Sequence, residues 1–183
     1  MSLNKYKYAD VIAAVSKDTA DTLQQCGLPA EQLCVIHSGI DLSRYTPKQT
    51  FTEVAKQEDE RFVFVVVGAL TPQKGHSVLI KAMSFLKHNH DLPPWEVRVI
   101  GDGPLFNNIL HEAKALGVEG HLALLGRQDA SKLLPFCDAM IVPSVDGEGS
   151  SGTIKEAWGV GLPLICSNLK ANLELEKKKK NAL

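Results

Sequence analysis

Residues 139–163, which read AMIVPSVDGEGSSGTIKEAWGVGLP, decide the fold of this chain. Their apolar start, Ala139–Val142, is typical of a buried strand, and the small residues after it indicate a loop that opens a helix at Thr153. The loop carries the carboxylate of Glu148 and the helix carries that of Glu156, while free backbone N–H groups at the helix start can hold an anion. Two carboxylates beside an anion site suit a ligand that has both phosphates and sugar hydroxyls, such as a nucleotide-sugar.

A second interpretation of the same stretch needs no ligand. The spacing from Thr153 to Glu156 fits a capping box, in which the glutamate only satisfies a backbone N–H group at the helix start. Glu148 would then be an ordinary loop carboxylate. The residues upstream of this stretch decide between the two interpretations.

The bulk composition indicates a globular protein without a large charged surface. The 183 residues are 44% apolar, which allows one ordinary domain, or one domain and part of another. The 20 basic and 21 acidic residues nearly cancel, so we expect no nucleic-acid partner. No apolar run approaches the roughly 20 residues that span a bilayer. The four cysteines form no CxxC pair and the six histidines are scattered, so we expect reduced thiols, no metal site and a cytoplasmic protein, with the inner face of a membrane as a second location.

Apolar runs rich in β-branched residues alternate with helical patterns along most of the chain. The run Phe62–Val67 is continuously apolar, as expected for a strand that is covered on both faces. The alternation predicts βαβ units, and therefore an α/β fold with a Rossmann-like, doubly wound parallel sheet. The expected strands are Val11–Val15, Leu33–His37, Phe62–Val67, Glu96–Ile100, Leu122–Leu125, Ala139–Val142 and Leu164–Cys166. The expected helices are Lys17–Cys26, Ser77–His88, Leu105–Leu116, Ala130–Phe136 and Thr153–Trp158.

One polar segment interrupts the alternation and divides the chain. Residues 41–60 contain Pro47 and a charged run at 56–60, which is typical of a linker. We therefore expect residues 1–42 to end one domain, residues 43–60 to link, and residues 61–183 to form a second domain. The charged stretch from Glu174 to Asn181 has no apolar periodicity, so we expect a solvated tail or the end of a truncated helix.

Four loops are expected at the carboxyl ends of the strands, where ligands of doubly wound sheets bind. The first carries Gly68 and Lys74, and this lysine can meet a phosphate or simply be solvated. The second is the turn from Gly101 to Gly103, whose glycines permit close backbone approach or a tight turn alone. The third carries Arg127, which fits a base pocket or an ordinary surface. The fourth is the loop after Ala139–Val142 that carries Glu148, called the glutamate loop below. A nicotinamide-binding Rossmann enzyme is disfavoured, because the loop after Phe62–Val67 has no GxGxxG.

The order and spacing of these loops resemble the nucleotide-sugar-binding half of GT-B glycosyltransferases, in the large retaining group often called family 4. The resemblance runs from about Ala9 to about Glu174. The matching pieces are Ala9–Ser16, Val35–Asp41 followed by Pro47, Val67–Gly68, Lys74–Gly75, Val99–Pro104, Leu125–Gly126, Cys137–Ser144, Glu148–Gly149, Glu156–Ala157 and Gly161–Pro163.

The resemblance implies a site and an activity. Lys74 would contact the donor diphosphate and, with Glu148 near the donor sugar, would be catalytic, while Glu156 would hold the ribose. The reaction would transfer a hexose from a UDP- or GDP-sugar to a hydroxyl of a glycan or lipid-linked saccharide, with no metal. The implied donor site is Gly68, Lys74, Gly101, Gly103, Arg127, Glu148, Gly149, Ser150, Ser151, Gly152, Thr153 and Glu156.

Two departures from the family pattern change what is expected of this chain. Ala69 stands where the family usually has an arginine that contacts the diphosphate. Only the last βαβ piece of the acceptor-binding half is matched, and the closing C-terminal helices are not. We therefore expect the chain alone to be inactive and to self-associate through an exposed interdomain surface. The alternatives are a non-catalytic nucleotide-sugar-binding remnant and a GT-B nucleotide-sugar epimerase.

Overall fold

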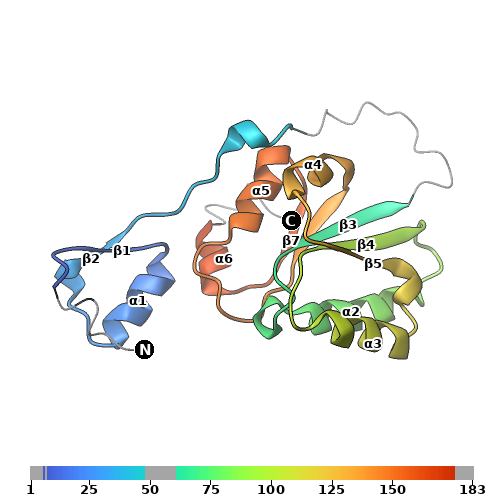
Figure 1. Ribbon diagram of the computed structural model, residues 1–183, viewed down its shortest axis with the longest axis horizontal. Coiled ribbons are helices and arrows are strands. Elements are labelled where there is room, and N and C mark those ends of the chain that lie inside the picture. Colours follow the sequence, from blue (N-terminus) through green and yellow to red (C-terminus); the bar gives the residue numbers. More distant parts are fainter. Residues whose placement is uncertain (1–5, 7, 48–60, 176–183) are drawn as a thin grey trace.

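A computed structural model describes residues 6, 8–47 and 61–175 of the chain. Part of the expected linker and most of the expected tail, residues 48–60 and 176–183, therefore lie outside the described residues. The described chain forms a small βαβ unit and a larger α/β unit (Figure 1). In the small unit, β1 (Ile12–Ala14) and β2 (Leu33–Val35) pair in parallel across α1 (Lys17–Gln25). This confirms the expected βαβ fragment, with strands shorter by up to two residues.

The larger unit contains a five-stranded sheet in the order β5-β4-β3-β6-β7, and all neighbouring strands are parallel. The predicted parallel sheet is therefore confirmed. The longest pairing runs the full length of β3 against β4, from Phe62 opposite Trp95 to Val67 opposite Ile100. The strands are β3 (Phe62–Val67), β4 (Trp95–Ile100), β5 (Leu122–Gly126), β6 (Ala139–Val142) and β7 (Leu164–Cys166).

Helices cover both faces of this sheet, which is why β3 is apolar at every position (Figure 1). Val65 belongs to the core under α5 (Gly152–Val160), with Met140 and Ile154. Val66 points to the other face and packs with Leu79 of α2 (His76–Leu86), because neighbouring side chains of a strand alternate between faces. Two further helices of this unit are α3 (Phe106–Ala115), whose Ile109 joins the α2 core, and the short α4 (Ala130–Leu133), which passes into a 3₁₀ turn at Leu134–Phe136. None of the described helices is long and apolar enough to cross a membrane.

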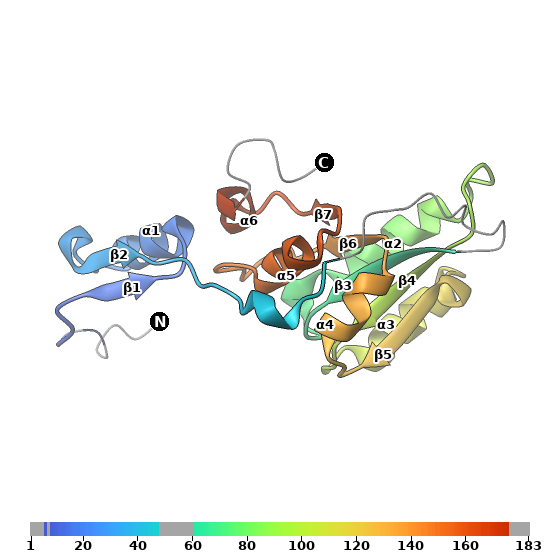
Figure 2. The ribbon, with the colours of Figure 1, turned by 90° about the horizontal axis from the view of Figure 1, so that it is seen from above.

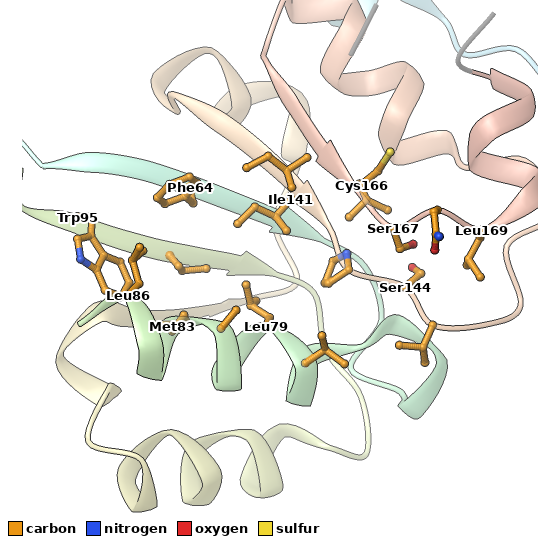
Figure 3. Close-up of a pocket in the computed structure, with 18 residues that line it drawn as sticks. Phe64, Leu79, Met83, Leu86, Trp95, Ile141, Ser144, Cys166, Ser167 and Leu169 are labelled. Carbon is orange, nitrogen blue, oxygen red and sulfur yellow. The ribbon is translucent and has the colours of Figure 1, made fainter. Parts of the chain in front are cut away.

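On the face that α2 covers, the described helices leave β6 and β7 open. A largely apolar pocket of about 630 Å³ lies there, between α2 and the strand ends. Figure 3 shows Phe64 and Ile141 of the sheet opposite Leu79 and Met83 of α2. Ile165 of β7 is 53% exposed at this edge. The pocket follows from the strand order. α2 packs on β3, and β7 lies two strands beyond β3, so α2 leaves this edge of the sheet uncovered.

A contact that was not predicted from the sequence joins the small unit to the larger unit. Helix α6 (Lys170–Leu175) brings Glu174 to the start of α1, where both carboxylate oxygens accept a hydrogen bond from the Lys17 N–H at 2.8 Å. The His37 ring nitrogen Nε2 lies 3.4 Å from the same carboxylate. Glu174 and Leu175 are helical, so at these first residues the end of a helix is the expectation that holds, and the solvated tail is not. Glu174 also satisfies a free N–H group of a helix start.

Candidate functional site

Glycines bring the first two loops of the carboxyl edge into backbone contact. Gly101 has φ +153°, and a Cβ atom there would lie 1.8 Å from the carbonyl oxygen of Gly68. A Cβ atom on Gly103 would lie 2.7 Å from the carbonyl oxygen of Leu70. Both expected glycines therefore allow a close approach that no other residue permits. The loop after β4 is also joined to the end of β5, because the Gly101 N–H donates to the Gly126 carbonyl at 2.8 Å.

The first and fourth loops meet in the same way. Gly75 lies in the left-handed region, with φ +69° and ψ +22°, and a Cβ atom there would lie 1.9 Å from the carbonyl oxygen of Pro143. Beside this contact the Val145 N–H donates to the Gln73 carbonyl at 2.8 Å. The loop that carries Lys74 is therefore seated on the loop that carries Glu148.

Lys74 and Glu148, both expected in the site, form an ion pair. The Lys74 Nζ lies 2.6 Å from Glu148 Oε1, and the hydroxyl of Ser144 donates to the same oxygen at 2.6 Å. The Glu148 side chain is only 6% exposed, against 29% for Lys74. The carboxylate is thus held in one orientation, and the two charges cancel locally. Ser144 was not among the predicted site residues, although its place at the end of β6 was a signal for one.

The helix that follows Glu148 starts without a side-chain cap. α5 begins at Gly152, its N-cap residue is Ser151, and no side-chain oxygen there accepts a cap hydrogen bond. The capping-box interpretation is therefore wrong: Thr153 is already inside the helix, and its hydroxyl lies 3.4 Å from the Val67 carbonyl. Among the described residues, no side chain accepts from the first N–H groups of this helix, so the loop Gly149–Gly152 leads into a local structure that an anion can occupy.

Glu156 faces the segment that joins the two units instead of capping its own helix. Its carboxylate lies close to the Tyr45 hydroxyl, and its Oε2 atom is buried with no hydrogen-bond partner among the described residues. Burial, followed by the negative charge of Glu156, raises the pKa of Tyr45. Tyr45 packs closely on α5, because a Cβ atom on Gly159 would lie 3.3 Å from the Tyr45 Cβ. Tyr45 falls within the expected linker and was not among the predicted site residues.

Lys155 places a second cation at the glutamate loop. Its Nζ donates to the hydroxyl of Ser150 at 2.7 Å and to the hydroxyl of Ser38 at 2.9 Å. Burial lowers the pKa of Lys155. The loop touches the small unit again at Gly149, where a Cβ atom would lie 3.0 Å from Val15 Cγ2. The candidate site therefore lies at the junction of the two units, which Figure 2 shows from above.

Arg127 lies apart from these contacts. It is exposed in the loop after β5, and β5 is three strands away from β6 in the sheet. At about 4.8 Å per strand, the ends of β5 and β6 lie roughly 14 Å apart. The expected role of Arg127 in a base pocket stays a prediction. Across residues 6, 8–47 and 61–175, no group of three or more histidine, cysteine or acidic side chains is placed to hold a metal ion.

Two family models match the chain over most of its length. The family model described as "Glycosyl transferases group 1" matches residues 47–183, and that described as "Glycosyltransferase Family 4" matches residues 2–44. The chain is 28% identical over 182 residues to UDP-Gal:alpha-D-GlcNAc-diphosphoundecaprenol alpha-1,3-galactosyltransferase of Escherichia coli, covering 91% of this chain and 47% of that protein. It is 25% identical over 169 residues to GDP-mannose-dependent alpha-(1-6)-phosphatidylinositol monomannoside mannosyltransferase of Mycolicibacterium smegmatis, covering 86% and 44%.

Among solved structures, Anabaena HepE in complex with UDP-glucose superposes with a TM-score of 0.78 and 25% identity, covering 92% of this chain and 48% of that one. HepE in complex with UDP and glucose gives a TM-score of 0.82 at 24% identity, covering 99% and 50%. The chain spans about half the length of the curated relatives that it matches.

Proposed function

Because this chain belongs to the glycosyl transferases group 1 family, we propose that it forms the nucleotide-sugar-binding part of a retaining glycosyltransferase. The observation that carries the proposal is the uncapped start of α5, which lies between the two expected glutamates. A solved relative of the same fold, Anabaena HepE, has been crystallised with UDP-glucose. The proposed ligand is a UDP- or GDP-sugar.

The proposed binding mode follows the chemistry of the loops. The first N–H groups of α5 and the Gly149–Gly152 loop bind the diphosphate, because they are donors at the positive end of a helix dipole. Glu156 accepts from the ribose hydroxyls through its buried Oε2 atom, which has no hydrogen-bond partner in the described part of the chain. Glu148 lies one residue before the loop, fixed by Lys74 and Ser144, and accepts from hydroxyls of the hexose.

The proposed reaction of the whole protein is hexosyl transfer. The bond from the anomeric carbon to the diphosphate oxygen breaks, and a bond to an acceptor hydroxyl oxygen forms on the same face of the sugar. The proton of that hydroxyl passes to the departing diphosphate. Lys74 and the loop N–H groups stabilise the charge that develops on the departing diphosphate. In this proposal the Lys74–Glu148 pair opens, at least in part, when the diphosphate arrives.

The proposed division of the chain assigns the acceptor to another part of the protein. Residues 1–42 would end the acceptor domain, residues 43–60 would link, and residues 61–183 would form the donor domain. The acceptor would be a glycan or lipid-linked saccharide. Transfer requires the acceptor hydroxyl to be held within about 3–3.5 Å of the anomeric carbon, so we expect this chain alone to bind the donor without transferring the sugar.

Calorimetry on the chain as given tests the proposal. UDP, GDP, their sugar conjugates and the bare nucleosides are titrated with and without EDTA. At least one nucleoside diphosphate should bind in both conditions. Lys74→Ala should weaken its binding by about tenfold or more while leaving nucleoside binding unchanged, because a charge-assisted contact is lost. Failure of every nucleotide to bind at millimolar concentration would overturn the proposal.

Glu148 and Glu156 give separate outcomes in the same titrations. Glu156→Ala should weaken free nucleotide and sugar conjugate alike, whereas Glu148→Ala should weaken only the sugar conjugate. A chain that binds the conjugate, but whose longer protein transfers no sugar, would support the non-catalytic alternative. Ala69 favours the non-catalytic alternative, because the loop that carries Lys74 has this alanine where the family usually has an arginine.

We also propose that the small unit mediates self-association. Its exposed apolar residues include Tyr8 at 89%, Val11 at 64% and Ile36 at 61% exposure. Apolar surface of this kind favours contact with another molecule. Light scattering should show a mass that rises with concentration, and a strict monomer at high concentration would contradict this.

A further inference from the structure

The charges at the glutamate loop are unevenly balanced. Lys74 is the lysine that the sequence assigns to the diphosphate, yet Glu148 neutralises it at 2.6 Å. An arriving diphosphate must compete with that carboxylate for the ammonium group, and it brings further negative charge next to Glu148. The pair therefore offers little net positive charge to an anion.

Lys155 is the cation of this loop whose charge is not balanced. Its described partners are the hydroxyls of Ser150 and Ser38, at 2.7 and 2.9 Å, and no carboxylate lies within ion-pair distance among the described residues. Burial lowers the pKa of its ammonium group. A partly buried ammonium group with only neutral partners gains from an anion more than a paired or fully solvated one does.

The position of Lys155 connects it to the loop Gly149–Gly152, to which we assign the diphosphate. Ser150 lies within Gly149–Gly152, immediately before the N-cap residue of α5, so the ammonium group contacts the loop that leads into the helix start. Ser38 follows β2 of the small unit. The same ammonium group thus touches the proposed donor loop and the other unit.

We propose that Lys155 supplies the unbalanced positive charge that binds the donor diphosphate, exchanging its contact with Ser38 for a phosphate oxygen. This inference rests on the proposed function, because it assigns a further residue to the same site. It makes Lys155, beside Lys74, a determinant of diphosphate affinity. It also couples the donor to the junction of the two units, since binding releases a contact between them.

A purely structural role for Lys155 makes a different prediction. If the lysine only ties Ser38 to Ser150, then Lys155→Met and Ser38→Ala both lower stability, and neither changes the preference for a diphosphate over a bare nucleoside. Under the proposal the two variants differ. Lys155→Met loses diphosphate affinity, whereas Ser38→Ala keeps or gains it, because the ammonium group has one competitor fewer.

The experiment measures the ratio of uridine to UDP dissociation constants by calorimetry, or of guanosine to GDP if that base is preferred. Lys155→Met is compared with Lys81→Met, which removes the same charge from an exposed position on α2. Lys155→Met should lower the ratio by about tenfold or more while Lys81→Met leaves it unchanged, and Lys155→Arg should restore most of it. Thermal melting confirms that each variant is folded, and if Lys155→Met is not, Lys155→Gln replaces it.

The outcomes separate this inference from the proposed function. If the unaltered chain binds no nucleoside diphosphate, the proposed function fails. If it binds one, but Lys155→Met and Lys81→Met give the same ratio, the role of Lys155 is refuted while the proposed function stands. A loss of affinity in Ser38→Ala equal to that in Lys155→Met would also refute it, because the tie between the units would then be what matters.

Discussion

Replacing Gly75 by alanine should lower the stability of the fold in two ways, through a left-handed backbone that alanine disfavours and through a steric clash. The same replacement at Gly161 has only the first of these effects and is the matched control. Both glycines have left-handed backbone angles, at φ +69° and ψ +22° for Gly75 and at φ +75° and ψ +27° for Gly161. A side chain at either position carries the same conformational penalty, about 1–2 kcal/mol. They differ in surroundings, since a Cβ atom on Gly75 would lie 1.9 Å from the Pro143 carbonyl oxygen, while one on Gly161 would meet nothing within 4 Å.

The Pro143 carbonyl belongs to the backbone and cannot rotate away, so the two loops must separate in Gly75→Ala. Forcing extra volume into a packed contact costs roughly a further 1–3 kcal/mol. We therefore expect Gly161→Ala to lower the free energy of unfolding by about 1–2 kcal/mol and Gly75→Ala to lower it by about 2–5 kcal/mol. The separation should also strain the Val145 to Gln73 hydrogen bond, and hence the position of Lys74 beside Glu148.

Urea unfolding followed by circular dichroism measures both variants on the full chain. The midpoints give the difference in stability provided that the slope is unchanged. Calorimetry with UDP then reports the site, and we expect Gly75→Ala to weaken binding while Gly161→Ala leaves it intact. Equal destabilisation by the two substitutions, with unchanged UDP affinity, would refute the argument that the first and fourth loops are held together at Gly75.

Three further predictions concern other contacts. Tyr45→Phe keeps the ring but removes the hydroxyl that lies close to Glu156. It should weaken UDP binding more than 2′,3′-dideoxy-UDP binding in calorimetry, and equal losses would mean that the hydroxyl does not orient the carboxylate. Glu174→Ala removes the acceptor at the start of α1 and should destabilise that helix by about 0.5–2 kcal/mol, seen as faster amide hydrogen exchange in α1; unchanged exchange would contradict this. The pKa of Asp129 is lowered from 3.8 chiefly by the Ser131 hydroxyl, so its stabilising effect is complete above pH 3.8 and is lost as the pH falls through the lower folded value. Asp129→Asn should therefore show a smaller drop in melting temperature on acidification, and an unchanged drop would argue against that role.

Much of the fold was predictable because its signals are local. The uninterrupted apolar run of β3 predicts a strand covered on both faces, and a parallel sheet follows once helices alternate with such strands. Parallel strands place all their carboxyl ends at one edge, so the loops of Lys74, Gly101 and Glu148 were expected together. The glycines among them were predictable in kind, since close backbone approach excludes every other residue.

The tertiary structure alone decided which side chains meet. Lys74 and Glu148 are 74 residues apart, and Lys17 and Glu174 are 157 apart. Tyr45 lies in a polar segment and still packs against α5 beside Glu156. The periodicity of apolar residues indicates only which face of a helix or strand is buried. It carries no information about the partner of a polar group, because an ion pair or a hydrogen bond depends on the few ångströms between two atoms. That separation is set by how the elements pack, so the sequence by itself determined the sheet and its loops, and the folded chain determined the bonds between them.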